Sequence, residues 1–181
     1  MRILREKTAA VVIDVQSKLF PFISENEKIE KNILRLINGL KVLDIPILVT
    51  EQYTKGLGST IDSIKSIFTD DFNPIEKMQF SCMDNVDFQA NFLGLSKDTL
   101  IIFGIESHVC VLQTVIDTIA MGLIPVLVED CVSSRNLNDK YYAIERARRE
   151  GAIITTYEAI LFELTKVSGT EEFKKISKIV K

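Results

Sequence analysis

The sequence predicts an α/β protein with three α/β/α layers around a six-stranded parallel sheet, in a Rossmann-like arrangement. Short apolar runs without internal polar residues recur along the 181-residue chain, as in strands buried on both faces of a parallel sheet. Segments with apolar residues at helical spacing separate these runs. This alternation continues without a linker, repeat or low-complexity stretch, so we expect one domain over residues 1–181.

The first fifty residues predict a strand, a helix and a second strand. Residues 9–13 are continuously apolar and end at Asp14, which predicts the first strand. Apolar side chains at helical spacing predict a helix over residues 27–43. Pro46 interrupts the helical pattern, and residues 45–50 predict the second strand. The stripe on the helix consists of Ile29, Ile33, Leu36, Ile37, Leu40 and Leu43.

The next segment is richer in loops. Residues 51–60 contain two glycines and several polar groups, and they predict a long loop at the carboxyl end of the second strand. A short helix over residues 61–68 and a third strand over residues 74–77, poor in apolar residues, follow. Residues 85–93 predict a helix that ends at Gly94, a good C-cap residue.

The centre of the chain predicts the most regular elements. Residues 100–103 form an apolar strand that turns at Gly104. Residues 109–121 form an amphipathic helix, with an apolar face opposite a polar one. Residues 124–128 predict the fifth strand, and residues 130–137 predict a polar loop.

The last third continues the alternation. Residues 138–150 predict a helix with Asn138 as its cap and with Glu145 and Arg149 at i,i+4 spacing. Gly151 ends this helix. The remaining predicted elements are a strand at 152–155 and helices at 157–164 and 171–180.

Charge and hydropathy narrow the class of partner. The chain has 22 Lys and Arg residues against 25 Asp and Glu, a formal net charge of −3, with the two signs interspersed. A nucleic-acid surface needs clustered basic residues, so we expect a small-molecule substrate and no nucleic-acid partner. No apolar segment approaches the ~20 residues that span a bilayer. Asp14 and Gln16 interrupt the only apolar run near the start, so we expect neither a membrane partner nor a signal peptide.

The cysteines indicate a reducing compartment. Cys82, Cys110 and Cys131 are widely spaced and odd in number. They match neither a disulfide framework nor a CxxC metal pattern. We therefore expect a cytoplasmic protein, in which Cys82 and Cys131 are small buried residues.

Cys110 is the predicted nucleophile. It lies in the first turn of the helix expected after Gly104, where the helix dipole favours the thiolate. Parallel sheets place such a junction at their carboxyl edge, where ligands bind. Asp14, Glu51 and Asp130 end or follow other predicted strands and reach the same edge. Asp14 can accept the thiol proton there, although on strand position alone a capping role is the simpler interpretation.

A histidine and a lysine are the remaining polar candidates. His108 lies two residues before Cys110, and side chains at this spacing diverge at a helix start, so we expect it to shape the loop or face solvent. Because it is the single histidine, a metal site of several histidines is excluded. Lys77 would stabilise a thiolate if it lay near one, whereas by residue type it is an ordinary surface lysine.

Three aromatic residues can either line an apolar pocket or pack in the core. They are Phe20, Tyr53 and Phe80. Phe20 and Tyr53 lie on loops at the predicted site edge, so we expect these two to line a substrate pocket.

Several segments resemble a known family. Residues 9–16 read A-A-V-V-I-D-V-Q, residues 76–77 are Glu-Lys before a loop, and residues 104–114 read G-I-E-S-H-V-C-V-L-Q-T. In this order they resemble the isochorismatase-like cysteine hydrolase superfamily over nearly the whole chain. Its isochorismatase domain-containing branch is similar at residues 50–60, T-E-Q-Y-T-K-G-L-G-S-T, and at residues 130–135, D-C-V-S-S-R.

The resemblance implies the isochorismatase-like hydrolase fold, a homo-oligomer and a catalytic triad. Cys110 would attack a carbonyl or related carbon, Asp14 would accept its proton and Lys77 would hold the charge. The resemblance also implies a cis peptide bond between Ile105 and Glu106, beside the substrate pocket. The backbone N–H groups of Glu106 and Cys110 would then form an oxyanion hole.

Departures from the family pattern narrow the chemistry. Nicotinamidases of this superfamily have an Asp-x-His metal cluster after the second strand, whereas residues 50–53 here contain no histidine. We therefore expect no zinc or iron and no cofactor. Isochorismatase cleaves a vinyl ether without a cysteine nucleophile, so Cys110 indicates amide or related C–N hydrolysis. Glu106 and Ser107 replace the usual small residue and threonine, and Glu106 would either select a cationic or hydrogen-bond-donating substrate or face away.

Two other classes of function stay open. One is a non-catalytic interaction module that retains the fold and uses apolar helix surface for a partner. The other is a thiol redox sensor in which Cys110 pairs with Cys131.

Overall fold

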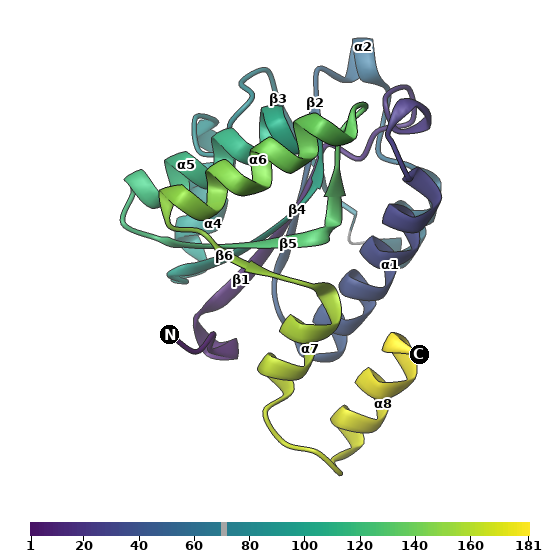
Figure 1. Cartoon of the computed structure of the whole chain (residues 1–181), viewed down its shortest axis with the longest axis vertical. Helices are drawn as coiled ribbons and strands as arrows, with labels where there is room; N and C mark the ends of the chain where they lie inside the picture. Colours follow the sequence, from purple (N-terminus) through teal and green to yellow (C-terminus); the bar gives the residue numbers. More distant parts are fainter. Residues whose placement is uncertain (70–71) are drawn as a thin grey trace.

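In the computed structural model of the chain, six parallel strands form one sheet in the order β3-β2-β1-β4-β5-β6 (Figure 1). The structure describes residues 1–69 and 72–181. The strands are β1 (Thr8–Ile13), β2 (Ile47–Gln52), β3 (Ile75–Lys77), β4 (Thr99–Ile105), β5 (Ile124–Ser133) and β6 (Ile153–Thr155). The helices are α1 (Asn26–Val42), α2 (Thr54–Leu57), α3 (Asp62–Phe68), α4 (Val86–Gly94), α5 (Leu112–Ala120), α6 (Leu137–Glu150), α7 (Tyr157–Thr165) and α8 (Glu171–Val180).

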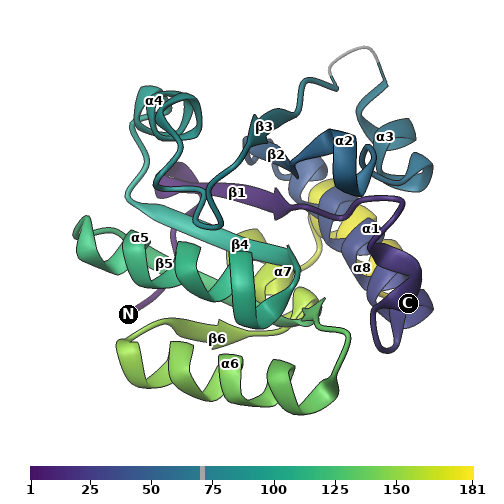
Figure 2. The same ribbon diagram turned by 90° about the horizontal axis from the view of Figure 1, so that it is seen from above.

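Helices cover both faces of the sheet, which confirms the predicted three layers. In Figure 2, α5 and α6 lie on one face, and α1 and α7 lie on the other with α8 packed against them. Every residue of the central strands β1 and β4 is buried, which explains their continuously apolar sequences. Across the described ranges, no helix combines the length and apolar character needed to cross a bilayer.

The strand order creates a crevice between β1 and β4. The chain passes from β1 to β2 on one side of the sheet centre and from β4 to β5 on the other. Parallel sheets bind ligands beyond the carboxyl ends of the strands at such a reversal of order. Asp14 follows β1 and the Cys110 turn follows β4, so the fold brings these two segments together.

Gly104 is part of β4, and the predicted turn at this residue is wrong. It pairs with Ile13 across the ladder and has a positive φ of 123°. A Cβ atom on Gly104 would lie 2.6 Å from the Ile13 nitrogen and closer still to the Ile13 carbonyl oxygen. The backbones of β1 and β4 therefore approach too closely here for any side chain, directly before Asp14.

Two predicted loops are shorter than expected because neighbouring strands extend the ladder. β2 continues to Gln52, since residues 50–52 pair with residues 75–77 of β3, and α2 occupies part of the loop predicted at 51–60. β5 continues to Ser133, since its register against β4 shifts after Ile102 and then resumes.

Several helix ends also differ from the prediction. Asn136, not Asn138, caps α6 by accepting the Asn138 N–H at 2.9 Å. Gly94 is the last residue of α4 and takes no left-handed conformation. The first of the predicted charge partners on α6, Glu145, forms its ion pair with Arg148. Gly151 ends α6 with a φ of 114°, as predicted.

Replacing Gly104 with alanine is expected to lower the free energy of unfolding by more than about 2 kcal/mol, because the Cβ atom meets immobile backbone at a positive φ. Gly94→Ala is the control, since its Cβ atom would meet nothing within 4 Å. Alanine is the better helix former, so we expect that variant to be neutral or slightly stabilised. Urea denaturation measures both, and equal stabilities would contradict the close approach of β1 and β4.

Candidate active site

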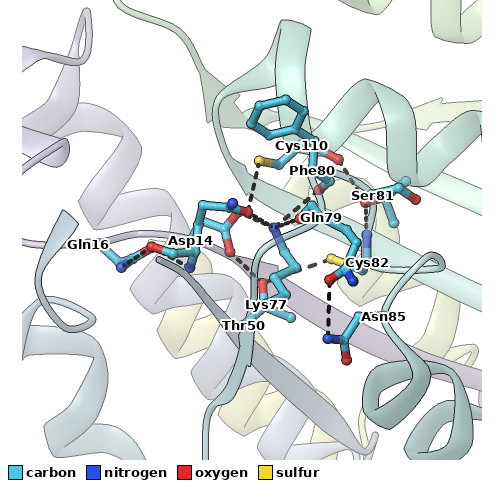
Figure 3. Close-up of polar contacts among 12 residues, drawn as sticks. Asp14, Gln16, Thr50, Lys77, Gln79, Phe80, Ser81, Cys82, Asn85 and Cys110 are labelled. Atoms are coloured by element: carbon cyan, nitrogen blue, oxygen red, sulfur yellow. Dashed lines mark hydrogen bonds and ion pairs between the residues drawn. The ribbon is translucent and has the colours of Figure 1, made fainter. Parts of the chain in front are cut away.

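A fully buried ion pair lies at the crevice between β1 and β4. The Lys77 ammonium donates to Asp14 Oδ2 at 2.7 Å, and each residue is only 1% exposed (Figure 3). The thiol of Cys110 points toward this pair from the segment that follows β4. The structure thus brings together the three residues predicted as a triad from positions far apart in the sequence.

The backbone directs the Asp14 carboxylate into the site. Asp14 leaves β1 in the left-handed region, with a φ of 52°, a conformation that aspartate tolerates better than most residues. Its N–H donates to the Thr50 carbonyl at 3.2 Å, which holds the turn against β2. The Thr50 hydroxyl donates to Asp14 Oδ1 at 2.7 Å, so both carboxylate oxygens are engaged.

The short strand β3 positions Lys77. Its ammonium also donates to Gln52 Oε1 at 2.7 Å and to the carbonyls of Gln79 at 3.2 Å and Phe80 at 3.1 Å. Burial is the largest influence and disfavours the charged form, but the charge and hydrogen bond of Asp14 together with the Cys82 and Cys110 thiols outweigh it, so the pKa of Lys77 is raised above its ordinary value. Lys77 is therefore a permanent cation in the site. The interpretation of Lys77 as an ordinary surface lysine is wrong.

Gln52 is a site residue that sequence reasoning missed. It pairs with Lys77 across the β2–β3 ladder, so both side chains project to the same side. Its Oε1 lies 4.0 Å from the Cys110 sulfur, and its Nε2 donates to the Met78 carbonyl at 2.9 Å. The Gln16 amide fixes its backbone through bonds of 2.7 and 3.0 Å. Gln52 lies beyond the predicted strand end at residue 50, so the apolar pattern carried no signal for it.

Cys110 lies on a π-helical turn over Ser107–Val111, not in the first turn of an α-helix as predicted. The Glu106 carbonyl accepts the N–H groups of Val109 at 3.1 Å and Val111 at 3.3 Å, one on each side of Cys110. The Thr114 hydroxyl donates to the Cys110 carbonyl at 2.7 Å. π turns inside helices are rare and are frequent at functional sites.

The Cys110 thiol is protonated in the resting protein. Burial raises its pKa well above the ordinary value, the Asp14 carboxylate raises it further, and Lys77 only partly opposes this. The prediction that the helix terminus favours a thiolate is therefore wrong for the free protein. The neighbouring Cys82 is also buried beside Lys77, and burial raises its pKa to about 12.

A cavity of about 230 Å³ opens onto the Cys110 sulfur. Its wall combines apolar side chains with a few polar ones. The lining residues are Asp14, Leu19, Gln52, Leu57, Phe80, Ile105, Glu106, Val109, Cys110 and Arg135. Ile105 therefore lines the cavity as predicted.

Two predicted pocket residues lie elsewhere. Phe20 packs in the hydrophobic core, 7% exposed, because a short 3₁₀ turn over Phe20–Phe22 directs it inward. Tyr53 is about half exposed and lines a second surface hollow with Lys55, Glu76, Lys77, Met78, Gln79 and Asn85. Phe80, the aromatic residue that we did not favour, takes the place beside Cys110.

Glu106 lines the cavity and is paired with Arg135. Its Oε1 accepts both the N–H and the Nε of Arg135, each at 3.0 Å. The peptide bond between Ile105 and Glu106 is cis, as the resemblance implies. Arg135 was not predicted as a site residue, because its link to Glu106 depends on the extension of β5.

Other residues expected at the carboxyl edge have structural roles. Glu51 accepts the N–H and hydroxyl of Thr60 at 2.7 and 2.8 Å. Asp130 accepts the Tyr157 N–H at 2.9 Å, at the start of α7. The His108 ring bonds Ser134 at 3.0 Å, which fits the predicted role in shaping the loop.

The two thiols that the redox-sensor alternative would pair, Cys110 and Cys131, lie among different charged groups. Within residues 1–69 and 72–181, no three His, Cys, Asp or Glu side chains group as metal ligands. Cys131 is completely buried, and the charged groups that act on its pKa are Asp130 and Lys140. Those that act on Cys110 are Asp14 and Lys77, and the neighbouring Cys82 thiol also acts on it.

Comparison with known proteins identifies relatives along the whole chain. A family model described as "Isochorismatase domain" matches residues 8–159. Isochorismatase family protein 1B of Dictyostelium discoideum is 39% identical over 99% of this chain and 89% of its own length. The structure of the MAR1 ribonuclease from Caenorhabditis elegans is 36% identical, with a TM-score of 0.92 over 99% of this chain and 92% of that chain.

A more distant structure shows how widely the fold recurs. The YcaC gene product of Escherichia coli, described as an octameric hydrolase of unknown specificity, is 23% identical with a TM-score of 0.92. The match covers 99% of this chain and 89% of that chain. At this identity the likeness shows the fold alone.

Removing one partner of the buried ion pair is expected to destabilise the protein at least as much as removing both partners. Asp14→Asn leaves the Lys77 ammonium without its counter-ion, and Lys77→Met leaves the carboxylate, so each should lower the free energy of unfolding by about 3 kcal/mol. The double variant should lose no more than either single variant, so the two losses are non-additive by about 3 kcal/mol. Chemical denaturation of the four proteins measures this coupling, and additive losses would contradict it.

Proposed function

Because the chain belongs to the isochorismatase family, we propose that it is a metal-independent cysteine hydrolase acting on a small amide or a related C–N substrate. One observation carries the proposal. A buried carboxylate and a buried ammonium adjoin a thiol that lines a cavity of about 230 Å³. A purely structural core would not retain two buried charges beside an accessible thiol.

The proposed reaction begins with a neutral thiol. The Cys110 sulfur attacks the substrate carbonyl carbon while its proton passes to Asp14, and the C=O electron pair moves onto oxygen. The raised pKa of Cys110 supports transfer of the proton during the attack, because little thiolate exists beforehand. Lys77 stays charged and stabilises the anionic oxygens and sulfur that develop.

The intermediate then collapses to a thioester. The C–N bond breaks as the nitrogen takes the proton held by Asp14, and the amine leaves. A water molecule attacks the thioester carbonyl, again giving its proton to Asp14. The C–S bond breaks, the sulfur recovers the proton and the carboxylic acid product leaves.

The backbone N–H groups of Glu106 and Cys110 are the proposed oxyanion hole. The two N–H groups that bond the Glu106 carbonyl belong to Val109 and Val111, so the Cys110 N–H between them is not used there. Donors held before the reaction stabilise a tetrahedral oxyanion without reorganising.

The cavity favours a small, uncharged substrate. Its volume of about 230 Å³ is below the ~300–1,000 Å³ of typical small-molecule sites. Arg135 offsets the negative charge of Glu106, so that carboxylate is better suited to accept a hydrogen bond from a substrate N–H than to hold a cation. Leu19, Leu57 and Phe80 would pack against an apolar substituent.

The name of the Caenorhabditis elegans relative raises RNA as a second candidate substrate. Against it stand the small volume of the cavity, about 230 Å³, and the interspersed charges of a chain with a net charge of −3. A phosphodiester polyanion needs a cationic surface to approach. A single domain, a homo-oligomer and a cytoplasmic location remain predictions, as do the interaction-module and redox-sensor alternatives.

Thiol labelling tests the proposed electrostatics. Cys110 lines the cavity whereas Cys82 and Cys131 are fully buried, so iodoacetamide should modify Cys110 first, at a rate that rises with pH above 9 because its pKa is raised. Asp14→Asn removes a charge that raises this pKa and should speed labelling near pH 8 several-fold. Lys77→Met should slow it.

Peptide mass spectrometry assigns the labelled residue, and Cys110→Ala controls for background. Equal labelling of all three cysteines, or rates unchanged in both charge variants, would count against the proposed triad.

A substrate panel tests the activity. Small amides, ureides and carbamoyl compounds are incubated with wild type and with Cys110→Ala and Asp14→Asn. Loss of the nucleophile should reduce hydrolysis of any accepted compound by at least ~10³-fold. The Asp14→Asn variant should lose hydrolysis although iodoacetamide labels its Cys110 faster. This combination would show that Asp14 is needed for proton transfer and not for the reactivity of the sulfur. Cleavage of single-stranded RNA that needs Cys110, without amide hydrolysis, would favour the second candidate.

A further inference from the structure

Thr114 joins two segments of the site through one side chain. It lies on α5, one turn after Cys110, and is completely buried. Its hydroxyl donates to the Cys110 carbonyl at 2.7 Å and accepts the Cys82 N–H at 3.0 Å. A backbone N–H can only donate and a carbonyl can only accept, so the direction of both hydrogen bonds is fixed. The single hydroxyl therefore ties the turn that carries Cys110 to the loop that carries Cys82.

The two segments that meet at Thr114 hold different parts of the site. The loop after β3 supplies the carbonyls of Gln79 and Phe80 that accept from the Lys77 ammonium. Phe80 also lines the cavity. The other segment is the π turn that carries the Cys110 sulfur. The distance between this thiol and the buried ion pair depends on how the two segments lie against each other, and Thr114 bonds both of them.

Two other helical threonines show what is unusual about Thr114. Thr118 and Thr165 each donate to the carbonyl four residues earlier, at 2.6 and 2.7 Å, which is a common bond for a threonine inside a helix. The bond that Thr114 accepts is of another kind, because its donor, Cys82, lies 32 residues away in the sequence. Without the hydroxyl, the buried Cys82 N–H would lose this acceptor, and an unpaired buried N–H is costly.

We propose that Thr114 is a positioning residue, which holds the Cys110 turn against the loop after β3 and thereby sets the Cys110 sulfur beside the buried ion pair. Because the Thr114 side chain has no exposed surface, it cannot touch a substrate and acts through Cys110. The hydrogen bond to the Cys110 carbonyl restricts the backbone, so rotation about Cα–Cβ alone is left to place the sulfur. A misplacement of about 1 Å can cost ~10²-fold in rate. The catalytic part of this proposal rests on the proposed function, whereas the placement of the sulfur does not.

Thiol labelling tests the placement of the sulfur without a substrate. Thr114→Val keeps the shape of the side chain and removes the hydroxyl, which loosens the Cys110 turn. Burial and Asp14 both raise the pKa of Cys110, so a looser turn should lower this pKa and speed iodoacetamide labelling near pH 8 by at least about 5-fold. Thr118→Val is the matched control, because Thr118 is equally buried on the same helix and its hydroxyl, among the described residues, bonds only that helix. Its labelling rate should match wild type, and Thr114→Ser, which keeps the hydroxyl, should restore the wild-type rate.

Labelling of Cys131 separates a local change from unfolding. Cys131 is completely buried, so its rate reports opening of the whole protein, and the rate of Cys110 should rise more than that of Cys131. If Thr114→Val does not fold, Thr114→Ala takes its place, because it leaves room for water at the two freed backbone groups. The proposal is overturned if the hydroxyl-free variant leaves the Cys110 rate and its pH dependence unchanged, or if Cys131 shares the rise equally. It is also overturned if Thr118→Val has the same effect, or if Thr114→Ser does not restore the rate.

Steady-state kinetics test the catalytic part with any compound that the substrate panel identifies. Thr114→Val should lower kcat at least ~10-fold and change KM less than about 3-fold, because the cavity wall is intact and only the reacting sulfur is displaced. Thr118→Val should change neither constant. An unchanged kcat, or a loss confined to KM, overturns the catalytic role of Thr114. If no compound is hydrolysed, the proposed function fails, while the labelling experiment still decides whether Thr114 places the sulfur.

Discussion

The buried ion pair between Asp14 and Lys77 is the interaction on which the rest of the site depends. Two opposite charges at 1% exposure can be kept ionised only if each has further partners. Lys77 has them in Gln52 and in the carbonyls of Gln79 and Phe80, and Asp14 has one in Thr50. These partners come from β2 and from the loop after β3, so the register of β2 against β1 and β3 must be held for the charges to meet. Well-packed apolar residues would stabilise such a core at least as well, and we infer that the charges are kept for chemistry.

The same ion pair controls the state of the thiol. Asp14 and burial keep the proton on Cys110, and Lys77 opposes them without prevailing. A protonated thiol is a poor nucleophile toward chance electrophiles and oxidants. Attack then requires a substrate whose carbonyl is already positioned, because only there can Asp14 take the proton as the C–S bond forms. The pKa that makes the resting protein unreactive thus adds selectivity to the proposed reaction.

The sequence was sufficient to predict the order of the elements and to place Asp14 and Cys110 at one edge of the sheet for a physical reason, whereas Lys77 joined them only through the family resemblance. Continuous apolar runs identify buried parallel strands, and strand ends define the edge at which a site forms. Gln52 and Arg135 could not be found in this way, because each enters the site through a ladder that extends beyond the apolar run. Phe80 lines the cavity where Phe20 was predicted, and the cause is similar, because local turns of the chain decide which aromatic ring faces the cavity. The π turn at Cys110 has no sequence signal that separates it from an α-helical first turn.

The fold also connects the junction between β5 and α6 to the site. Arg135 binds Glu106 through both its backbone and its side chain, and the next residue, Asn136, caps α6. His108, from the turn that carries Cys110, bonds Ser134 directly before this junction. Arg135 lines the cavity, and α6 begins two residues later at Leu137. The short segment between β5 and α6 therefore holds both the turn that carries Cys110 and the Glu106 carboxylate, so the end of β5 shapes the cavity although no residue of its predicted apolar run reaches it.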